Sequence, residues 1–334
     1  MEKYKIAFFD AKPYDYDYFV PLAKNTALEI KFLETNLNPT TALLANGCDA
    51  VCLFCNDVLN AEIADIFFGQ GIKLISLRSA GFNNVDLNAI HGRIPVVNVP
   101  AYSPHAVAEY ALALLLTLNR KTHKAYARTR DGNFSLVGLE GFDLCGKTTG
   151  IIGTGKIGRI AAEICRGFGM NVLAFDPYPQ QEWADAHGIR FVNIKDLLRQ
   201  SDIISLHCPL TAENKHLINS EAIASMKPGV FIINTGRGGL IDTGALIKGL
   251  KSKQIGAAGL DVYEEEDGYF FEDHSGEVIQ DDTLVRLMSF PNVLVTSHQA
   301  FFTKEALTAI AKTTIENCLA FFERHELPNE VKLH

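Results

Sequence analysis

The sequence predicts an α/β protein made of two domains, each with a parallel sheet. Three observations lead to this fold class. The chain has 334 residues, which is long for one hydrophobic core and comfortable for two. Short apolar runs alternate with helical patterns in two successive series, as expected of parallel strands joined by helices. A glycine-rich motif opens the second series.

The first hundred residues contain apolar runs of strand length. These runs are YKIAFF, LEIKFLE, DAVCLFC, IKLISLR and IPVVNV. The segment that follows, residues 103–130, has the pattern of one long helix. Ser103 suits its N-cap, Pro104 suits its first turn, and basic residues gather at its end.

The second series starts near Lys147 and predicts about six strands in a second parallel sheet. Its runs are TTGII, NVLAFD, DIISLH, GVFIIN, AAGLDV and NVLVTS. The chain then ends in a predicted helix over residues 303–323. The apolar residues that recur there at helical spacing are Leu307, Ile310, Ala311, Ile315, Cys318, Leu319 and Phe322.

The composition is that of an ordinary soluble globular protein, with 47% hydrophobic and 21% charged residues. A formal net charge of −8 provides no basic surface for nucleic acid or anionic lipid. The N-terminus lacks the apolar region of a signal peptide, and the most apolar run, residues 111–118, is too short to span a bilayer. We therefore expect a cytoplasmic protein with neither a nucleic-acid nor a membrane partner.

The seven cysteines are an odd number scattered through apolar contexts, which favours reduced thiols. Cys48, Cys52 and Cys55 lie close together, but a zinc site needs a fourth ligand and a knuckle turn, and neither is visible. They occupy a run typical of a buried strand, where cysteine behaves as a small hydrophobe. We therefore expect no metal.

The glycine-rich motif predicts a dinucleotide site. Gly153, Gly155 and Gly158 have the G-x-G-x-x-G spacing, follow an apolar run and open a helical pattern. An acidic residue, Asp176, ends the next run, 18 residues after Gly158. A carboxylate there would accept hydrogen bonds from a ribose diol and repel a 2′-phosphate, so NAD is favoured over NADP. The alternative is a plain glycine-rich turn with a surface aspartate beyond it.

Three further polar residues follow strands of the second series, where an open α/β sheet places its ligands. They are Arg237, Asp261 and His298. Taken singly, each could be a surface or core residue with no chemical role. Together they supply an anion clamp, a carboxylate partner and an acid/base group. This set suits proton transfer coupled to hydride transfer on a small carboxylate.

Long motifs in order along nearly the whole chain resemble the D-isomer-specific 2-hydroxyacid dehydrogenases. The motifs are NGCDAVCLF, LRSAGFNNVDL, VPAYSPHAVAEYA, RTRDGNFSL, GTGKIG, VLAFDPYP, ISLHCPLT, NTGRGGLID and VTSHQAF. Within the family, the chain resembles the fermentative bacterial enzymes, which implies NADH-dependent, reversible reduction of pyruvate to D-lactate. Ser297 departs from the Pro or Gly that often precedes the histidine in relatives, with no evident catalytic consequence.

The resemblance also implies roles for individual residues. Arg237 would bind the substrate carboxylate and help to polarise the keto carbon. His298 would donate the proton, with Glu266 hydrogen-bonded behind it and Glu264 as the alternative partner. The other implied substrate contacts are Ala80, Gly81, Tyr102 and Phe301. The implied cofactor contacts, in addition to the three glycines and Asp176, are Lys156, Ile157, Cys208, Pro209, Asn214, Thr235, Gly236 and Asp261.

The family resemblance further implies that the two parallel-sheet domains are Rossmann-like or flavodoxin-like, with a cleft between them. It implies a discontinuous substrate domain, residues 1–101 with 300–334, and an NAD-binding domain, residues 102–299. A homodimer or homotetramer is expected. Two other functions remain open at this point. One is an enzyme of the same family with a larger 2-ketoacid substrate. The other is a non-catalytic NADH sensor of the same fold, which would bind NADH without turning it over.

Overall fold

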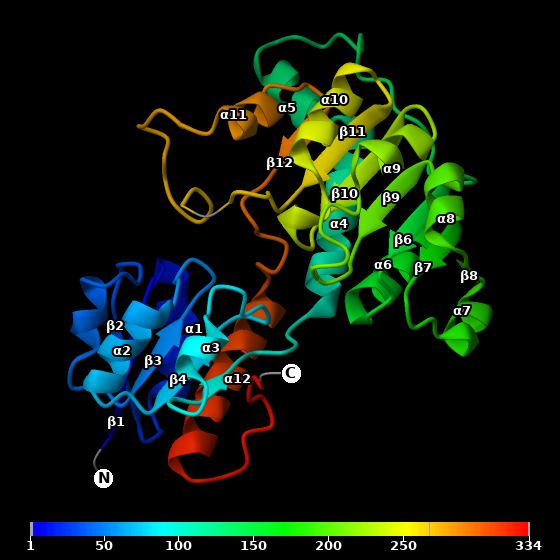
Figure 1. Cartoon of the computed structure of the whole chain (residues 1–334). Coiled ribbons are helices and arrows are strands. Elements are labelled where there is room, and N and C mark those ends of the chain that lie inside the picture. Colours follow the sequence, from blue (N-terminus) through cyan, green and yellow to red (C-terminus); the bar gives the residue numbers. More distant parts are fainter. Residues whose placement is uncertain (1–2, 267, 333–334) are drawn as a thin grey trace. The chain divides into compact units, whose positions relative to one another are not determined.

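The computed structural model describes residues 3–266 and 268–332, and the chain divides into two compact units. Unit 1 comprises Met1–Ser103 and Phe302–His334, and unit 2 comprises Pro104–Phe301 (Figure 1). Each unit contains one parallel sheet with helices on both faces, so the predicted α/β fold class is confirmed. Among the described residues, none of the helices is both long and apolar enough to cross a membrane.

The sheet of unit 1 has five parallel strands in the order β2-β1-β3-β4-β5. This is the flavodoxin order, in which the chain reverses direction across the sheet beside the first strand. The strands are β1 (Tyr4–Phe8), β2 (Leu28–Phe32), β3 (Ala50–Leu53), β4 (Leu74–Leu77) and β5 (Val96–Val97). The reversal places the ends of β1 and β3 side by side.

Alternate residues of β1 bury their side chains on opposite faces of this sheet, as the period of a strand requires. Ile6 and Phe8 pack with α1 (Pro13–Ala23) and α12 (Lys304–Phe322), whereas Ala7 packs on the other face. That other face is covered by η1 (Thr41–Ala45), α2 (Ala61–Gly69) and α3 (Leu87–Ile90). The C-terminal helix thus completes a core begun by the first strand.

The sheet of unit 2 has seven parallel strands in the order β12-β11-β10-β9-β6-β7-β8. Its strand order reverses between β6 and β9, as in a Rossmann fold. The strands are β6 (Thr148–Ile152), β7 (Asn171–Phe175), β8 (Arg190–Phe191), β9 (Ile203–Leu206), β10 (Val230–Asn234), β11 (Ile255–Leu260) and β12 (Val293–Val295).

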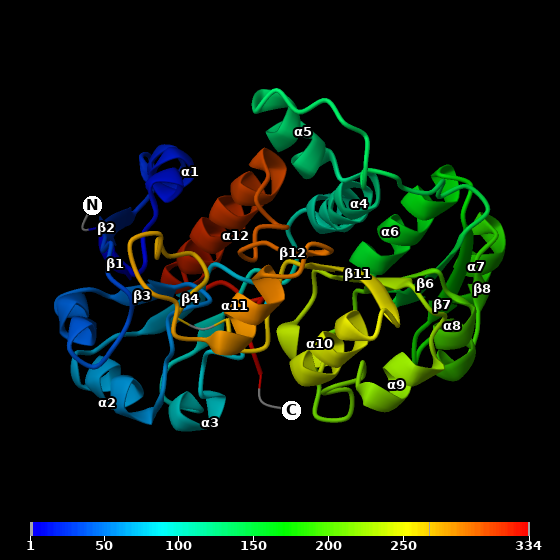
Figure 2. The ribbon, with the colours of Figure 1, turned by 90° about the horizontal axis from the view of Figure 1, so that it is seen from above.

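Two helical layers cover the sheet of unit 2 (Figure 2). One layer contains α4 (Pro104–Arg120), α6 (Lys156–Gly167) and α7 (Gln181–His187). The other contains α8 (Ile194–Gln200), α9 (Ser220–Ser225), α10 (Thr243–Lys251) and α11 (Asp282–Met288). A short 3₁₀ turn, η2 (Gly238–Leu240), follows β10.

Two expectations for unit 2 were wrong. The predicted helix over residues 103–130 is broken at Lys121 into α4 and α5 (Thr122–Arg130). Lys121 has a φ of 50°, a left-handed conformation that a right-handed helix cannot contain. The sheet also has seven strands where about six were predicted, because β8 is only two residues long and leaves no hydrophobic pattern.

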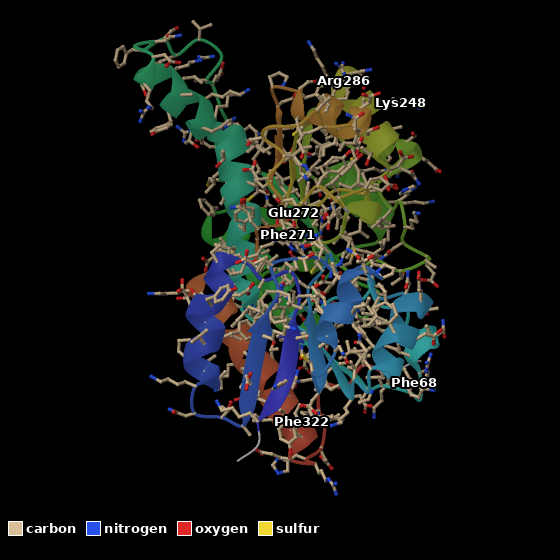
Figure 3. All side chains as sticks on the ribbon, turned by 90° about the vertical axis from the view of Figure 1, so that its left-hand side faces the viewer. Phe68, Lys248, Phe271, Glu272, Arg286 and Phe322 are labelled. Carbon is tan, nitrogen blue, oxygen red and sulfur yellow. The ribbon has the colours of Figure 1, made fainter. Side chains whose placement is uncertain are left out.

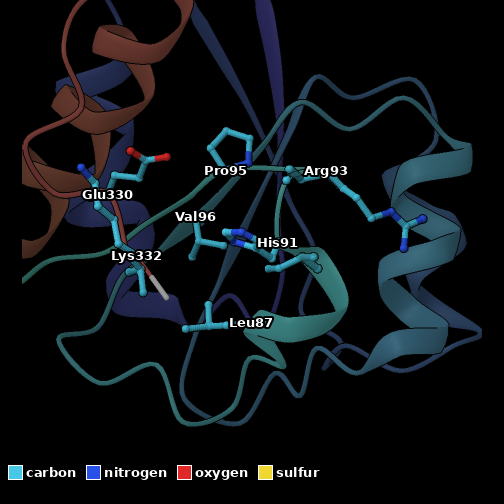
Figure 4. Close-up of a pocket in the computed structure, with 11 residues that line it drawn as sticks. Leu87, His91, Arg93, Pro95, Val96, Glu330 and Lys332 are labelled. Carbon is cyan, nitrogen blue, oxygen red and sulfur yellow. The ribbon is translucent and has the colours of Figure 1, made fainter. Parts of the chain in front are cut away.

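A pocket of about 490 Å³ lies beside the edge strand β5 in unit 1 (Figure 4). The C-terminal segment forms one wall, since the Val331 N–H donates to the Val96 carbonyl at 2.8 Å. Arg93 lines the pocket, but its guanidinium turns towards α2, with Nη1 2.8 Å from Asp65 Oδ1 and the group 4.5 Å from the Phe68 ring centroid. The C-terminal segment therefore pairs with an otherwise open sheet edge.

A buried arginine, Arg78, lies directly after β4 in unit 1. Its guanidinium is sandwiched between aromatic rings, 4.3 Å from the centroid of Phe8 and 4.7 Å from that of Phe54. Nη2 donates to the backbone carbonyl of Asp10 at 2.7 Å and lies 3.9 Å from Oδ2 of Asp15. Burial alone would lower the pKa of Arg78, but Asp15 and the other carboxylates outweigh it and raise that pKa.

Asp57 is a second buried carboxylate beside Arg78. It accepts hydrogen bonds from the backbone N–H groups of Leu37 at 2.8 Å and Phe54 at 2.7 Å. Burial raises the pKa of Asp57 to about 6, although the Arg78 charge and these N–H groups act in the opposite direction. The Arg78 charge therefore stabilises the ionised forms of Asp15 and Asp57, whereas the buried carboxylate of Asp10 is paired with Lys12 Nζ at 2.7 Å.

We predict that Arg78→Met lowers the free energy of unfolding by about 3–5 kcal/mol, because it leaves buried carboxylates without their cation. Urea denaturation at pH 7, followed by circular dichroism, measures the loss. Arg93→Met is the matched control in the same unit, since its partner Asp65 is exposed, and it should cost at most about 1 kcal/mol. Equal losses in the two variants would contradict the assignment.

Candidate active site

The first loop of unit 2 requires glycine at two positions of the G-x-G-x-x-G motif. Gly153 follows β6 with a φ of 90°, and a Cβ there would lie 2.6 Å from the backbone nitrogen of Cys208. A Cβ on Gly158 would lie 1.9 Å from the carbonyl oxygen of Gly153. The loop can therefore turn from β6 into α6, against the loop after β9, only when both side chains are absent.

The remaining glycine of the motif faces open space. Gly155 is the N-cap of α6, and nothing lies within 4 Å of a Cβ placed on it. Lys156 and Ile157 form the first turn of the helix, whose N-terminus favours an anion through its N–H groups and its dipole. The open position and the helix end together fit the pyrophosphate of a dinucleotide.

Asp176 lies directly after β7 and is bound to the glycine loop. Its Oδ2 accepts from the backbone N–H of Thr154 at 2.7 Å and from the Thr154 hydroxyl at 3.0 Å. Its Oδ1 accepts from the Tyr178 N–H at 2.9 Å. A carboxylate has about four acceptor positions, so one remains for a ribose hydroxyl. The aspartate is thus held beside the pyrophosphate position with acceptor capacity to spare.

Three other predicted cofactor residues lie in the loop after β9. Asn214 shapes this loop, because its Nδ2 donates to the Pro209 carbonyl at 2.8 Å and its Oδ1 accepts from the Thr211 N–H at 2.7 Å. Cys208 adjoins Gly153, and burial, together with the charge of Asp176, raises the pKa of its thiol to about 11. The thiol is therefore neutral near pH 7.

The loop after β10 carries Thr235 and Gly236. The Thr235 hydroxyl is buried and has no hydrogen-bond partner within residues 3–266 and 268–332. Because a buried hydroxyl normally has a partner, a polar atom of a bound cofactor would fit there. The backbone N–H of Gly236 donates to Asn234 Oδ1 at 3.0 Å.

Arg237 follows directly, and its backbone is held by its neighbours. Asn234 Nδ2 donates to the Arg237 carbonyl at 2.9 Å, and Arg237 Nη1 donates to the Gly236 carbonyl at 2.8 Å. A Cβ on Gly238 would lie 2.0 Å from the carbonyl oxygen of Tyr263, so the loop packs directly on the segment after β11. Asn234, which was not predicted as a site residue, thus orients the Arg237 loop.

Asp261, at the end of β11, anchors the loop that carries the histidine. The side chain is fully buried, and it accepts from the Thr296 hydroxyl at 2.6 Å and from the backbone N–H groups of Gln299 at 3.0 Å and Ala300 at 2.8 Å. Its backbone carbonyl accepts from the His298 N–H at 2.8 Å. Burial raises the pKa of Asp261, and these donors oppose the rise. Its expected cofactor contact stays a prediction.

His298 is held in an uncommon backbone conformation, with a φ of 50°. Its Nδ1 lies 2.8 Å from Glu266 Oε1, and Glu266 Oε2 accepts from the Tyr263 N–H at 2.8 Å. When Nδ1 carries the proton of this hydrogen bond, Nε2 is the nitrogen left for acid/base exchange with a substrate.

The alternative partner, Glu264, is bound elsewhere. Its Oε1 lies 2.5 Å from Nε2 of His216, and its Oε2 accepts from the Thr243 hydroxyl at 3.1 Å. The structure thus brings Glu266 rather than Glu264 to His298. No group of His, Cys, Asp and Glu side chains in the described part of the chain could hold a metal ion.

In unit 1, the loop after β4 has two backbone carbonyls fixed by side chains. Asn98 Nδ2 donates to the Ala80 carbonyl at 2.9 Å, and the Ser79 hydroxyl donates to the Gly81 carbonyl at 2.8 Å. Asn98 is itself held, since Asn317 Nδ2 of α12 donates to its carbonyl at 2.8 Å. Because each peptide is planar, fixing a carbonyl also fixes the direction of the N–H across the same bond. These N–H groups could bind a carboxylate.

Three supporting side chains were not among the predicted site residues. Asn98 and Asn317 bind backbone carbonyls that are distant in sequence, which no local pattern reveals, whereas Ser79 binds the carbonyl two residues after it. Tyr102 is part of unit 1 and Phe301 is a buried residue at the end of unit 2. The substrate contacts expected of these two residues stay predictions.

Comparison with known proteins agrees with this arrangement. The family model of the D-isomer specific 2-hydroxyacid dehydrogenase, NAD binding domain, matches residues 112–300. The chain is 50% identical to D-lactate dehydrogenase of Escherichia coli (strain K12) over 98% of this chain and 99% of that one. The structure of a pyruvate reductase of Chlamydomonas reinhardtii is 44% identical, with a TM-score of 0.93, and the match covers 98% of this chain and 99% of that one.

A structure of D-2-hydroxyisocaproate dehydrogenase is 34% identical, with a TM-score of 0.85, over 98% of this chain and 99% of that one. The family model matches more than half of the chain, and the relatives match nearly all of it. The chain therefore belongs to the D-isomer-specific 2-hydroxyacid dehydrogenases, a family of NAD-dependent oxidoreductases, and carries their NAD-binding domain.

Proposed function

We propose that this protein is a D-lactate dehydrogenase that reduces pyruvate reversibly to D-lactate with NADH. The observation that carries the proposal is the His298–Glu266 pair, with Nδ1 and Oε1 2.8 Å apart. This pair lies at the carboxyl end of the same sheet that holds the nucleotide loop. The similarity to the Escherichia coli enzyme over nearly the whole chain supports the choice of substrate.

In this proposal, each side chain has a defined part in the reaction. The Arg237 guanidinium binds the substrate carboxylate as a planar fork and draws electron density from the keto group. Bound NADH supplies the hydride to the carbonyl carbon. Protonated His298 donates a proton from Nε2 to the carbonyl oxygen, while Glu266 keeps Nδ1 hydrogen-bonded and the ring oriented. In lactate oxidation, neutral His298 accepts that proton.

The two units have separate tasks in the proposal. Unit 1 is the substrate domain, where the backbone at Ala80 and Gly81 receives the carboxylate. Asn98 and Ser79 bind the carbonyls of these two residues and so orient the N–H groups of Gly81 and Phe82. Unit 2 is the NAD-binding domain. Tyr102 approaches the substrate carboxylate, and Phe301 faces the methyl group of pyruvate, which favours a small substrate.

We also propose a homodimer or homotetramer that works in cytoplasmic fermentation. The support for assembly comes from α5 and the loop behind it. None of the residues of α5 is buried, and Tyr126, Phe134, Leu136 and Val137 are exposed. A helix with no fully buried side chain gains little from packing on its own chain, so this exposed apolar surface suits a second subunit.

The similarity to D-2-hydroxyisocaproate dehydrogenase keeps one alternative open, a branched and larger 2-ketoacid as the substrate. We therefore test substrate choice first. In a panel of 2-ketoacids with NADH, pyruvate should have the highest kcat/KM and the product should be D-lactate. A preference for a branched or aromatic 2-ketoacid would support the alternative. NADH binding without turnover of any member would identify a sensor.

The two glutamates provide a test of the proton donor. Glu266→Gln retains a hydrogen-bonding group of the same shape but loses the charge that stabilises the imidazolium. We expect kcat/KM to fall at least tenfold, because a hydrogen bond to a charged group is worth about 1.5–3 kcal/mol. Glu264→Gln, the matched control, should stay within about threefold of wild type, since Glu264 is bound to His216 instead. The reverse order would show that Glu264 is the catalytic partner.

Cofactor choice depends on Asp176. Asp176→Ser removes the acceptor for the ribose diol and the charge that repels a 2′-phosphate. The ratio of kcat/KM with NADH to kcat/KM with NADPH should therefore drop at least about tenfold. Asp185→Ser on the exposed surface of α7 removes the same charge from the same unit and should leave the ratio unchanged. An unchanged ratio in Asp176→Ser would place the ribose elsewhere.

A further inference from the structure

One face of the His298 imidazole is covered by an aromatic ring from a different loop. The ring centroids of Phe271 and His298 are 5.8 Å apart, and the two planes are inclined by 30° (Phe271 is labelled in Figure 3). Stacked aromatic pairs at this separation attract each other beyond simple burial. The contact restricts the tilt of the imidazole, which a single hydrogen bond at Nδ1 leaves undetermined.

The segment that carries Phe271 is tied to the histidine loop at its beginning and at its end. At its beginning, Glu266 binds His298 Nδ1, and the Glu266 carbonyl accepts from the backbone N–H groups of Tyr269 and Phe270, each at 3.1 Å. At its end, the Phe271 N–H donates to the Ser297 hydroxyl at 3.1 Å. The buried ring of Phe270 anchors the turn in the core.

Both stacked residues adopt the left-handed backbone region, with φ of 70° at Phe271 and 50° at His298. Side chains with a Cβ rarely occupy this region unless surrounding contacts impose it, and such residues gather at functional sites. The Ser297 hydroxyl is one such contact. A side chain without an acceptor at position 297 could not make this tie.

We propose that Phe271 is a positioning residue for His298 and that Ser297 fixes the position of the Phe271 ring. The inference rests on the proposed role of His298 as proton donor. Glu266 holds the imidazole at Nδ1, and Phe271 holds its face, so that Nε2 points in one direction. Proton transfer depends steeply on such alignment, so we expect the contact to affect turnover rather than the Kd for NADH.

The test compares variants of the assembled full-length enzyme with pyruvate and NADH. Phe271→Leu should lower kcat about fivefold, the loss expected for one aromatic contact. The Kd for NADH should stay the same, and the solvent deuterium isotope effect on kcat should rise, because proton transfer becomes more rate-limiting. Phe271→Tyr keeps the ring and should restore kcat. Ser297→Ala should show the same changes with a smaller loss of kcat. Ser297→Thr keeps the hydroxyl acceptor and should have the kcat and isotope effect of wild type.

Tyr269→Leu is the matched control, since this ring lies in the same segment but contacts His274, with centroids 5.6 Å apart. It should leave kcat and the isotope effect unchanged. Wild-type kinetics in Phe271→Leu, or an equal loss in Tyr269→Leu, would overturn the proposal. A loss of kcat in Phe271→Leu with no change in the isotope effect would also overturn the proposal.

A second measurement separates this proposal from the proposed function. Diethyl pyrocarbonate modifies accessible imidazoles, and mass spectrometry of peptides reports the rate at His298. Phe271→Leu should raise that rate about threefold, because the covering ring is gone. A wild-type protein that reduces no 2-ketoacid would overturn the proposed function while leaving this readout intact. An unchanged modification rate would overturn the positioning role whatever the activity.

Discussion

The buried carboxylate of Asp261 is the interaction on which the geometry of the catalytic loop depends. A charged group without access to water must be satisfied by hydrogen bonds, and Asp261 obtains them from the Thr296 hydroxyl and the N–H groups of Gln299 and Ala300. These donors lie on both sides of His298. The loop therefore has little freedom to relax, and His298 can be kept at a φ of 50° that it would otherwise leave.

In unit 2, the glycine-rich loop after β6 and the loop after β10 keep their conformations because their backbones pack directly against the backbones of neighbouring segments. The glycines at 153, 158 and 238 each lie where a Cβ would meet backbone atoms, so neighbouring loops approach more closely than side chains would permit. Unit 1 uses a different means, in which Asn98 and Ser79 bind the carbonyls of the loop after β4 and Arg78 neutralises the carboxylates beside it. In both units, residues with no proposed part in the reaction fix the positions of the residues that are proposed to bind or react.

Much of the fold was predictable because its determinants are local. Alternating burial along β1, the helical spacing of α12 and the three glycines before α6 are all visible in short stretches of sequence. The break at Lys121 was not predicted, since a lysine gives no sequence signal for a left-handed backbone. The strand β8 was not predicted either, since two residues are too few to show alternating hydrophobicity. Ser297 looked inconsequential until its hydroxyl was found to accept the N–H of Phe271, 26 residues earlier in the chain.

The sequence by itself determined the fold class, the family and the cofactor, because periodicity and motif spacing are properties of neighbouring residues. Only the tertiary structure decided which glutamate meets His298. Glu264 and Glu266 are two residues apart and chemically identical, and they differ only in what surrounds them: His216 and Thr243 for the first, His298 and the Tyr263 N–H for the second. The family resemblance favoured Glu266, with Glu264 as the alternative. His216, Thr243 and His298 come from segments distant in sequence, so only the fold shows which glutamate reaches each of them.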